Sequence, residues 1–137
     1  MDSVTQKHDM ACGLACVSFV TGVPYEQFTE AISDEQLNTI GFYCPELVEL
    51  LGKNGLKYAW MQLPETETGR DFKPGDIVFV ERSKQLPYGH FLTKTSGGWM
   101  DPWINLTGGS DIAKARSGFR PSLPGRAEYL VYPTISN

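Results

Sequence analysis

The residues best suited to chemistry are a cysteine near the N-terminus and a glutamine shortly before it. Cys12 stands at the start of a predicted helix, where free backbone N–H groups and the helix dipole stabilise a thiolate. Because a thiolate attacks a carbonyl carbon far better than a thiol does, Cys12 is the candidate nucleophile. Gln6 carries an uncharged amide that, with the backbone N–H of Cys12, is suited to stabilising the oxyanion of acyl transfer.

A histidine and an aspartate in the second half of the chain are the candidate partners of Cys12. His90 begins a predicted strand, and Asp101 lies across a predicted turn at 97–98. An antiparallel hairpin places such positions side by side, so that Asp101 accepts from one imidazole nitrogen while the other faces Cys12. We therefore expect a Cys12–His90–Asp101 triad assembled by folding. The alternative for Asp101 is a turn residue that precedes Pro102.

Four further residues are predicted to line the substrate site, namely Gly13, Gly89, Trp99 and Trp103. The absence of a side chain at Gly13 lets a substrate backbone approach closely. Trp99 and Trp103 flank Asp101 on one strand face, where we expect them to shield its hydrogen bond to His90 from water. The alternative is that both are core aromatic residues.

Helices and strands that would hold these residues are indicated by the spacing of apolar side chains. Helices are predicted at 11–20, at 24–32 and from Pro45 to near Gly55. Strands are predicted at 56–63, 77–80, 90–95, 99–101 and 128–132, with an acidic loop at 64–71 and another loop at 102–127. Because the helices come first and no regular β–α alternation follows, the predicted class is α+β, with N-terminal helices packed on an antiparallel sheet.

The composition suits one domain over residues 1–137, because 41% of the residues are hydrophobic and 20% are charged. The formal net charge of −4 argues against charge-driven binding to nucleic acid or to an anionic membrane, and neither is an expected partner. The N-terminus lacks the basic head and apolar stretch of a signal peptide. The expected location is therefore the cytoplasm, or the exterior after export by machinery that reads no such signal.

The three cysteines are too few for a disulfide framework, so reduced thiols are expected. Cys16, one helical turn beyond Cys12, is expected in the core, and Cys44 is expected to be structural. The alternative is a metal site, because His8, Cys12 and Cys16 follow one another at spacings of four and Cys44 is available as a fourth ligand. Structural zinc sites prefer closer cysteine pairs, so we expect no metal and no cofactor.

A basic stretch without acidic residues spans positions 114 to 126. Its positive side chains are those of Lys114, Arg116, Arg120 and Arg126. Such a stretch is usually a solvated loop. The second interpretation is a surface that docks an acidic protein partner or substrate, or a flap over the cleft.

The order of these motifs resembles that of a known family. The matching segments are Gln6…Cys12-Gly13-Leu14-Ala15-Cys16, Gly22, Tyr25-Glu26-Gln27-Phe28, residues 45–58, Gly89-His90-Phe91 and Trp99-Met100-Asp101-Pro102. They resemble the double-glycine leader peptidases, which are papain-like cysteine peptidases, over roughly two-thirds of the chain. The resemblance implies a papain-like fold, Cys12 as nucleophile, His90 as general base and then acid, Asp101 as orienter and Gln6 in the oxyanion hole. The chain departs from the family in its longer, more basic loop at 102–127.

The expected function is hydrolysis of a peptide or related amide bond through a thioester at Cys12, with a peptide or protein as substrate. Two alternatives stay open: a secreted effector or toxin with the same active site, and a peptidase-like module that binds peptides without cutting them. Residues 73–78 also resemble a segment of papain-like cell-wall peptidases, but Ala11 and Gly13 stand where those enzymes usually carry an acidic residue and a serine.

Overall fold

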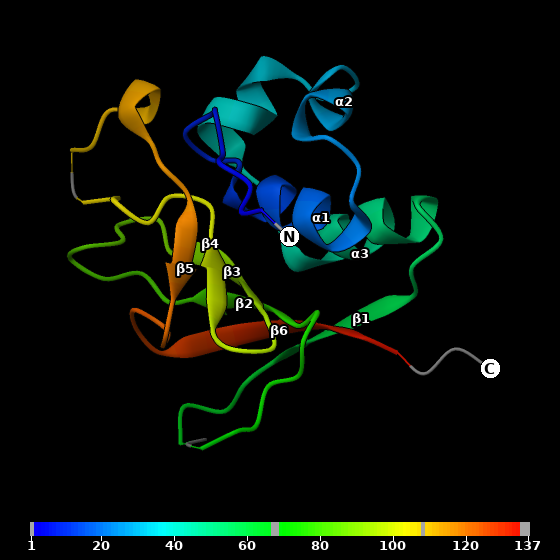
Figure 1. Ribbon diagram of the computed structural model, residues 1–137, viewed down its shortest axis with the longest axis vertical. Coiled ribbons are helices and arrows are strands. Elements are labelled where there is room, and N and C mark those ends of the chain that lie inside the picture. Colours follow the sequence, from blue (N-terminus) through cyan, green and yellow to red (C-terminus); the bar gives the residue numbers. More distant parts are fainter. Residues whose placement is uncertain (1, 67–68, 108, 135–137) are drawn as a thin grey trace.

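The computed structural model describes residues 2–66, 69–107 and 109–134 (Figure 1). Its helices are α1 (Cys12–Thr21), α2 (Tyr25–Thr29), the π-helix η1 (Gln36–Ile40), α3 (Cys44–Lys53) and the 3-10 helix η2 (Ile112–Lys114). Its strands are β1 (Tyr58–Gln62), β2 (Ile77–Val80), β3 (His90–Lys94), β4 (Trp99–Asp101), β5 (Gly118–Arg120) and β6 (Ala127–Pro133). Positions 67–68 of the predicted acidic loop and position 108 of the predicted 102–127 loop lie outside the described residues.

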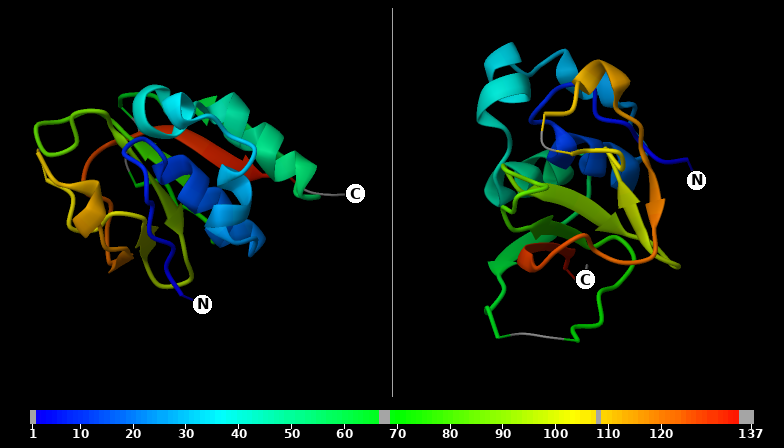
Figure 2. Two further views of the ribbon diagram at one scale, coloured as in Figure 1. Left: turned by 90° about the horizontal axis from the view of Figure 1, so that it is seen from above. Right: turned by 90° about the vertical axis from the view of Figure 1, so that its left-hand side faces the viewer.

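The strands form one antiparallel sheet in the order β1-β6-β2-β3-β4-β5. The last strand, β6, pairs with both β1 and β2, so it lies between two strands that precede it in the chain. On one face, α1 lies against β3, and α3 lies against β1 and β6 (Figure 2). The expected class is therefore confirmed: the chain is α+β, with N-terminal helices packed on an antiparallel sheet.

The core has two parts, one on each face of the sheet. The part beneath the helices joins α1 and α3 to the sheet through residues such as Leu14, Leu47 and Phe91, and these side chains are at most 4% exposed. The second part lies on the opposite face, where loop residues cover Val78 and Leu92 of the central strands. Burial on both faces explains why Ile77–Val80 is a continuous apolar run and not an alternating one.

Local signals mark both ends of α3, whereas α2 ends earlier than predicted. The helix α3 has Pro45 in its first turn and Lys53 in its last turn, both favourable positions. At its start, the backbone N–H of Tyr43 donates to the carboxylate of Glu46 at 2.8 Å. The helix α2 is shorter than the predicted 24–32, because regular α-helix ends at Thr29.

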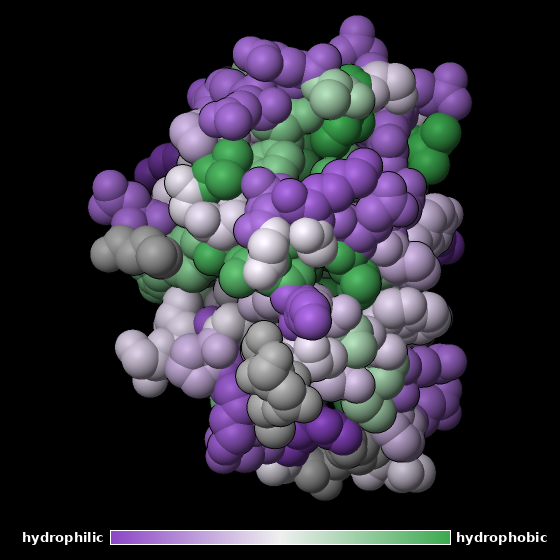
Figure 3. Space-filling model, turned by 90° about the vertical axis from the view of Figure 1, so that its right-hand side faces the viewer, coloured by the Kyte–Doolittle hydropathy of each residue, from purple (hydrophilic) through white to green (hydrophobic). Residues whose placement is uncertain are grey.

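Three elements were not predicted: the π-helix η1, the 3-10 helix η2 and the strand β5. The strand β5 lies inside the stretch expected to be a loop, and it pairs with β4 at the edge of the sheet. In the described parts of the chain, no helix is both long and apolar enough to cross a membrane. The large apolar side chains that solvent reaches there come from separate segments, and Figure 3 shows apolar groups interrupted by hydrophilic ones on one face.

Candidate active site

Cys12 is the first residue of α1 and is partly exposed. The first N–H groups of a helix have no partner within the helix, so the backbone around Cys12 presents donors. The backbone N–H of Phe91 in β3 also donates to the Cys12 sulfur, at 3.4 Å. The sulfur therefore lies where α1 meets β3, and it receives a hydrogen bond from that strand.

The packing of α1 accounts for a glycine at position 13, and the approach of a substrate to Gly13 stays a prediction. A methyl group at this position would come 3.0 Å from Leu47 of α3 and 3.1 Å from Phe91 of β3. The residue is buried, and a side chain at this position would point into the protein. The glycine therefore lets the helix that carries Cys12 lie close to the strand that begins with His90.

His90 and Asp101 form a short buried hydrogen bond. Nε2 of His90 lies 2.7 Å from Oδ1 of Asp101, and the two residues are 2% and 1% exposed. The strands β3 and β4 pair in the register Thr93↔Met100 and Lys94↔Trp99, which brings the end of β4 beside the start of β3. The backbone N–H of Trp103 donates to the same Oδ1 at 2.9 Å, so the carboxylate is held from two directions.

The charge of His90 depends on both of its neighbours. Burial is the largest single influence and lowers the pKa of the imidazole, because a charged ring loses water. The charge and hydrogen bond of the Cys12 sulfur and the hydrogen bond to Asp101 act in the opposite direction. Together they raise the pKa of His90 to about 10. The ring lies between the sulfur and the carboxylate, and both of these groups favour its protonated form.

A residue that the sequence did not single out, Arg120, completes the surroundings of Asp101. Its Nε lies 3.0 Å from Oδ2 of Asp101, the oxygen that His90 does not use. Burial, the largest influence, raises the pKa of Asp101, but the hydrogen bond and charge of His90, the Trp103 N–H and the charge of Arg120 lower it below its usual value. Nothing in the local sequence distinguishes Arg120 from the other cations of its basic stretch.

Comparison of the chain with protein-family models, with curated proteins and with solved structures found no match. The chemistry of the site therefore follows from its own atoms. Acyl transfer through a thioester needs a nucleophile, a base and a group that orients the base. The partly exposed Cys12 sulfur, the His90 imidazole and the buried Asp101 carboxylate are of the right types for these roles.

Gln6 lies beside this group, but its amide faces the chain itself. The residue is 1% exposed, and its backbone N–H donates to the carbonyl of Pro102 at 3.2 Å. The side-chain Nε2 donates to the carbonyls of His8 at 3.0 Å and Asp9 at 3.3 Å. Its Oε1 is buried with no hydrogen-bond partner in the described parts of the chain. An oxyanion role for Gln6 stays a prediction, and it requires that one amide hydrogen turn away from these carbonyls.

The other predicted substrate-site residues are mostly enclosed. Trp99 is 5% exposed and packs edge-to-face on Phe72 with ring centroids 5.3 Å apart. Trp103 is 4% exposed and contacts Asp101 through its backbone N–H. Gly89 has a φ of +73°, and a methyl group there would overlap the ring of Phe79. Their burial fits the alternative of core residues, and their contact with a substrate stays a prediction.

The metal-site alternative does not assemble. Among the residues that the structure describes, no three His, Cys, Asp or Glu side chains are placed to hold a metal ion together. His8 bonds through Nδ1 to the hydroxyl of Tyr25 at 2.8 Å, and all three cysteines are free thiols. Cys16 is fully buried, which raises its pKa well above the usual value, and burial raises the pKa of Cys44 to about 11. Both are core residues, as expected.

The basic stretch is partly used inside the molecule. Arg120 faces Asp101, and Arg126 pairs with Glu81 at 3.1 Å. Lys114 and Arg116 are exposed. A docking surface for an acidic partner stays a prediction, and in this structure it would depend chiefly on these last two side chains.

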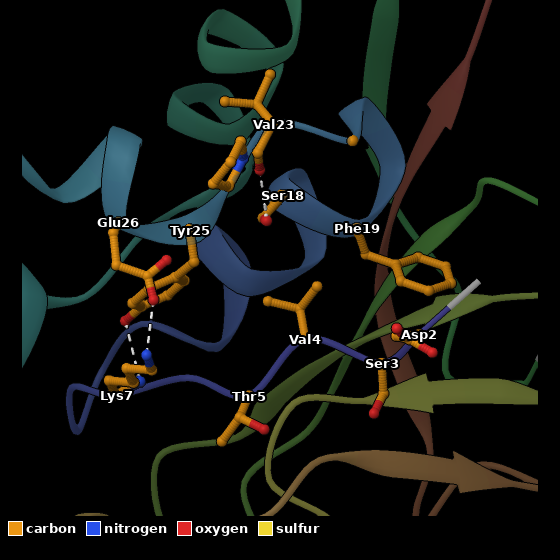
Figure 4. A pocket seen from close by; sticks show the side chains of 12 residues that line it. Asp2, Ser3, Val4, Thr5, Lys7, Ser18, Phe19, Val23, Tyr25 and Glu26 are labelled. Atoms are coloured by element: carbon orange, nitrogen blue, oxygen red, sulfur yellow. Dashed lines mark hydrogen bonds and ion pairs between the residues drawn. The ribbon is translucent and has the colours of Figure 1, made fainter.

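Two hollows lie away from the triad. One, of about 420 Å³, lies between the N-terminal segment 2–7 and the helices α1 and α2, where Lys7 pairs with Glu26 (Figure 4). The other, of about 520 Å³, lies between the end of α1, Pro74-Gly75 before β2 and the β3–β4 turn. The described residues that line them do not include Cys12, His90 or Asp101. Neither hollow therefore opens onto the candidate active site.

Proposed function

We propose that the chain is a cysteine peptidase or amidohydrolase of papain-like fold, which hydrolyses a peptide or related amide bond through a thioester at Cys12. The observation that supports this most is the short buried bond between Asp101 and the His90 ring, with the Cys12 sulfur near enough to raise the pKa of that ring. A helix that starts at the nucleophile and packs on an antiparallel strand that starts at the histidine supports the papain-like assignment.

The first half of the reaction forms the thioester. The Cys12 thiolate attacks the carbonyl carbon of the substrate, and the carbonyl oxygen becomes an oxyanion. The backbone N–H of Cys12 donates to this oxyanion, and Gln6 is the expected second donor. The C–N bond then breaks, and the His90 imidazolium gives its proton to the departing nitrogen, which leaves as an amine.

The second half releases the acid product. The neutral His90 imidazole takes a proton from a water molecule, whose oxygen attacks the thioester carbonyl. The C–S bond breaks, the carboxylic acid leaves, and the Cys12 thiolate and His90 imidazolium are restored. Asp101 stays ionised throughout and holds the ring in the tautomer and orientation that both steps need.

The rate of alkylation of Cys12 by iodoacetamide tests the thiolate on which the proposal depends. We expect Cys12 to react quickly below pH 7 in the wild-type protein, and His90→Ala to remove that advantage by about tenfold or more. Peptide mass spectrometry follows the three cysteines in the same molecule, so Cys16 and Cys44 are internal controls. If all three thiols react slowly, and their alkylation rates rise only at the pH usual for a cysteine thiol, the proposal is wrong.

A peptide-binding module without turnover is the second candidate. In this structure the Gln6 amide nitrogen donates to the backbone carbonyls of His8 and Asp9, so it does not face an oxyanion. The two candidates differ in the acyl-enzyme. Incubation with a mixed peptide library gives cleaved products from the wild-type protein, and none from Cys12→Ala, if the chain is a peptidase. Peptide binding by both proteins without cleavage by either would favour the module.

A further inference from the structure

The guanidinium of Arg120 occupies the side of the Asp101 carboxylate that His90 leaves free. Oδ1 of Asp101 is bonded to Nε2 of His90 at 2.7 Å, and it accepts a hydrogen bond from the backbone N–H of Trp103 at 2.9 Å. Oδ2 has Nε of Arg120 at 3.0 Å. The Nε–H bond does not point along the line to Oδ2, so this contact is an ion pair and not an aligned hydrogen bond.

The position of Arg120 follows from the pairing of β4 and β5. Trp99 pairs with Arg120 and Asp101 pairs with Gly118, so Arg120 and Asp101 are diagonal neighbours on the two strands. Such neighbours are within reach of a long side chain. At 3.5 Å, Nη2 of Arg120 also donates to the backbone carbonyl of Ile104, which gives the guanidinium a second attachment. The side chain is 27% exposed, whereas that of Asp101 is 2% exposed.

A buried carboxylate with one imidazole partner would meet a problem in each catalytic cycle. While His90 is an imidazolium, its charge balances that of Asp101. Once His90 has given its proton to a leaving group, a buried carboxylate beside a neutral ring loses that balance. The guanidinium stays charged through both states, because an arginine does not lose its proton in proteins.

We propose that Arg120 is a positioning residue of this site, which keeps Asp101 ionised and in place while His90 gains and loses its proton. This inference rests on the proposed function. Arg120 acts through Asp101 and does not touch the reacting atoms. The other paired arginine of the same basic stretch, Arg126, lies on Glu81 and has no contact with the triad among the residues described, so it is the matched control.

The test compares iodoacetamide alkylation of Cys12 against pH in five proteins: wild type, Arg120→Met, Arg120→Gln, Arg120→Lys and Arg126→Met. Loss of the Arg120 charge removes one of the groups that keep Asp101 ionised and in place. A protonated or displaced Asp101 stabilises the His90 imidazolium less, and the thiolate–imidazolium pair is then weaker. We expect the half-maximal pH of alkylation to rise by roughly one unit in the Met and Gln variants. Arg120→Lys, which keeps the charge, should recover most of the shift, and Arg126→Met should superimpose on wild type.

Protection of Cys16 in the same molecules reports whether each variant is folded, because this thiol is fully buried. Arg120→Gln keeps a polar side chain and is the second variant should Arg120→Met unfold. A folded Met or Gln variant with the wild-type profile would overturn the role of Arg120 alone. Equal shifts in the Lys and Gln variants would overturn it too, because charge would then not matter. A wild-type protein in which Cys12 has no advantage overturns the proposed function and this inference with it.

Discussion

At the scale of single residues, His90 links the groups of the site. Its ring is bonded to the Asp101 carboxylate, lies near enough to the Cys12 sulfur for that sulfur to raise its pKa, and is almost closed to solvent. Two opposing influences act on its charge. Burial removes water from the imidazolium, and the negative groups on either side replace that water. The groups beside His90, and not its own imidazole, therefore account for its raised pKa.

Replacing Cys12 by serine should lower the pKa of His90, because the charge of the sulfur is the largest influence that raises it. In a His8→Gln background His90 is the only histidine, so one set of imidazole resonances reports its titration by NMR. We expect the protein with Cys12 to keep the ring protonated well above its usual range, and the Cys12→Ser variant to lose the proton at lower pH. Coincident titration curves would mean that no charged sulfur lies beside the ring.

At the scale of elements, the turn before β3 sets the position of His90, the first residue of that strand. Gly89 has a φ of +73°, which L side chains rarely adopt, and a methyl group there would overlap the ring of Phe79 in β2. The opening of β3 is therefore set by contact with the neighbouring strand as well as by the turn.

Gly89→Ala should lower the free energy of unfolding by roughly 2–4 kcal/mol, from backbone strain together with overlap on Phe79. Gly22→Ala is the matched control, because Gly22 has a φ of +78° but open space where a methyl group would lie. Its cost should be backbone strain alone, roughly 1 kcal/mol. Urea denaturation followed by circular dichroism measures both. Equal losses in the two variants would show that Phe79 can move aside without cost.

At the scale of the whole molecule, the helices and the sheet share one core beneath α1 and α3. Cys16 of α1 and Cys44 of α3 both belong to it, together with Phe91 and Met100 of the sheet. Trp99 belongs to the core on the other face of the sheet. If the chain is a single domain, these two parts of the core should unfold together.

We expect Cys16 and Cys44 to become reactive over the same range of urea concentration in which tryptophan fluorescence changes, because neither face of the sheet is buried without the other. Pulsed alkylation with mass spectrometry gives a midpoint for each thiol. Release of Cys44 at clearly lower urea than the fluorescence change would show that the helical part opens by itself, and the single-domain prediction would then be wrong.

Local signals in the sequence were enough for several elements. The small and apolar run ahead of Gly22 indicated α1, Pro45 and Lys53 indicated α3, and the turn at 97–98 indicated the β3–β4 hairpin. These signals act between residues a few positions apart, so they do not depend on the rest of the fold. With the hairpin in place, His90 and Asp101 become neighbours, and their pairing followed from the sequence alone.

The tertiary structure decided what distant segments do to one another. The strand β5 carries little apolar pattern of its own and forms because β4 offers an edge, which brings Arg120 to Asp101. The Gln6 amide is oriented by the carbonyls of His8 and Asp9, and the need for glycine at position 13 comes from side chains of α3 and β3. A contact between segments joined only by folding leaves no periodic trace in either one, because its energy depends on the pair and not on local conformation.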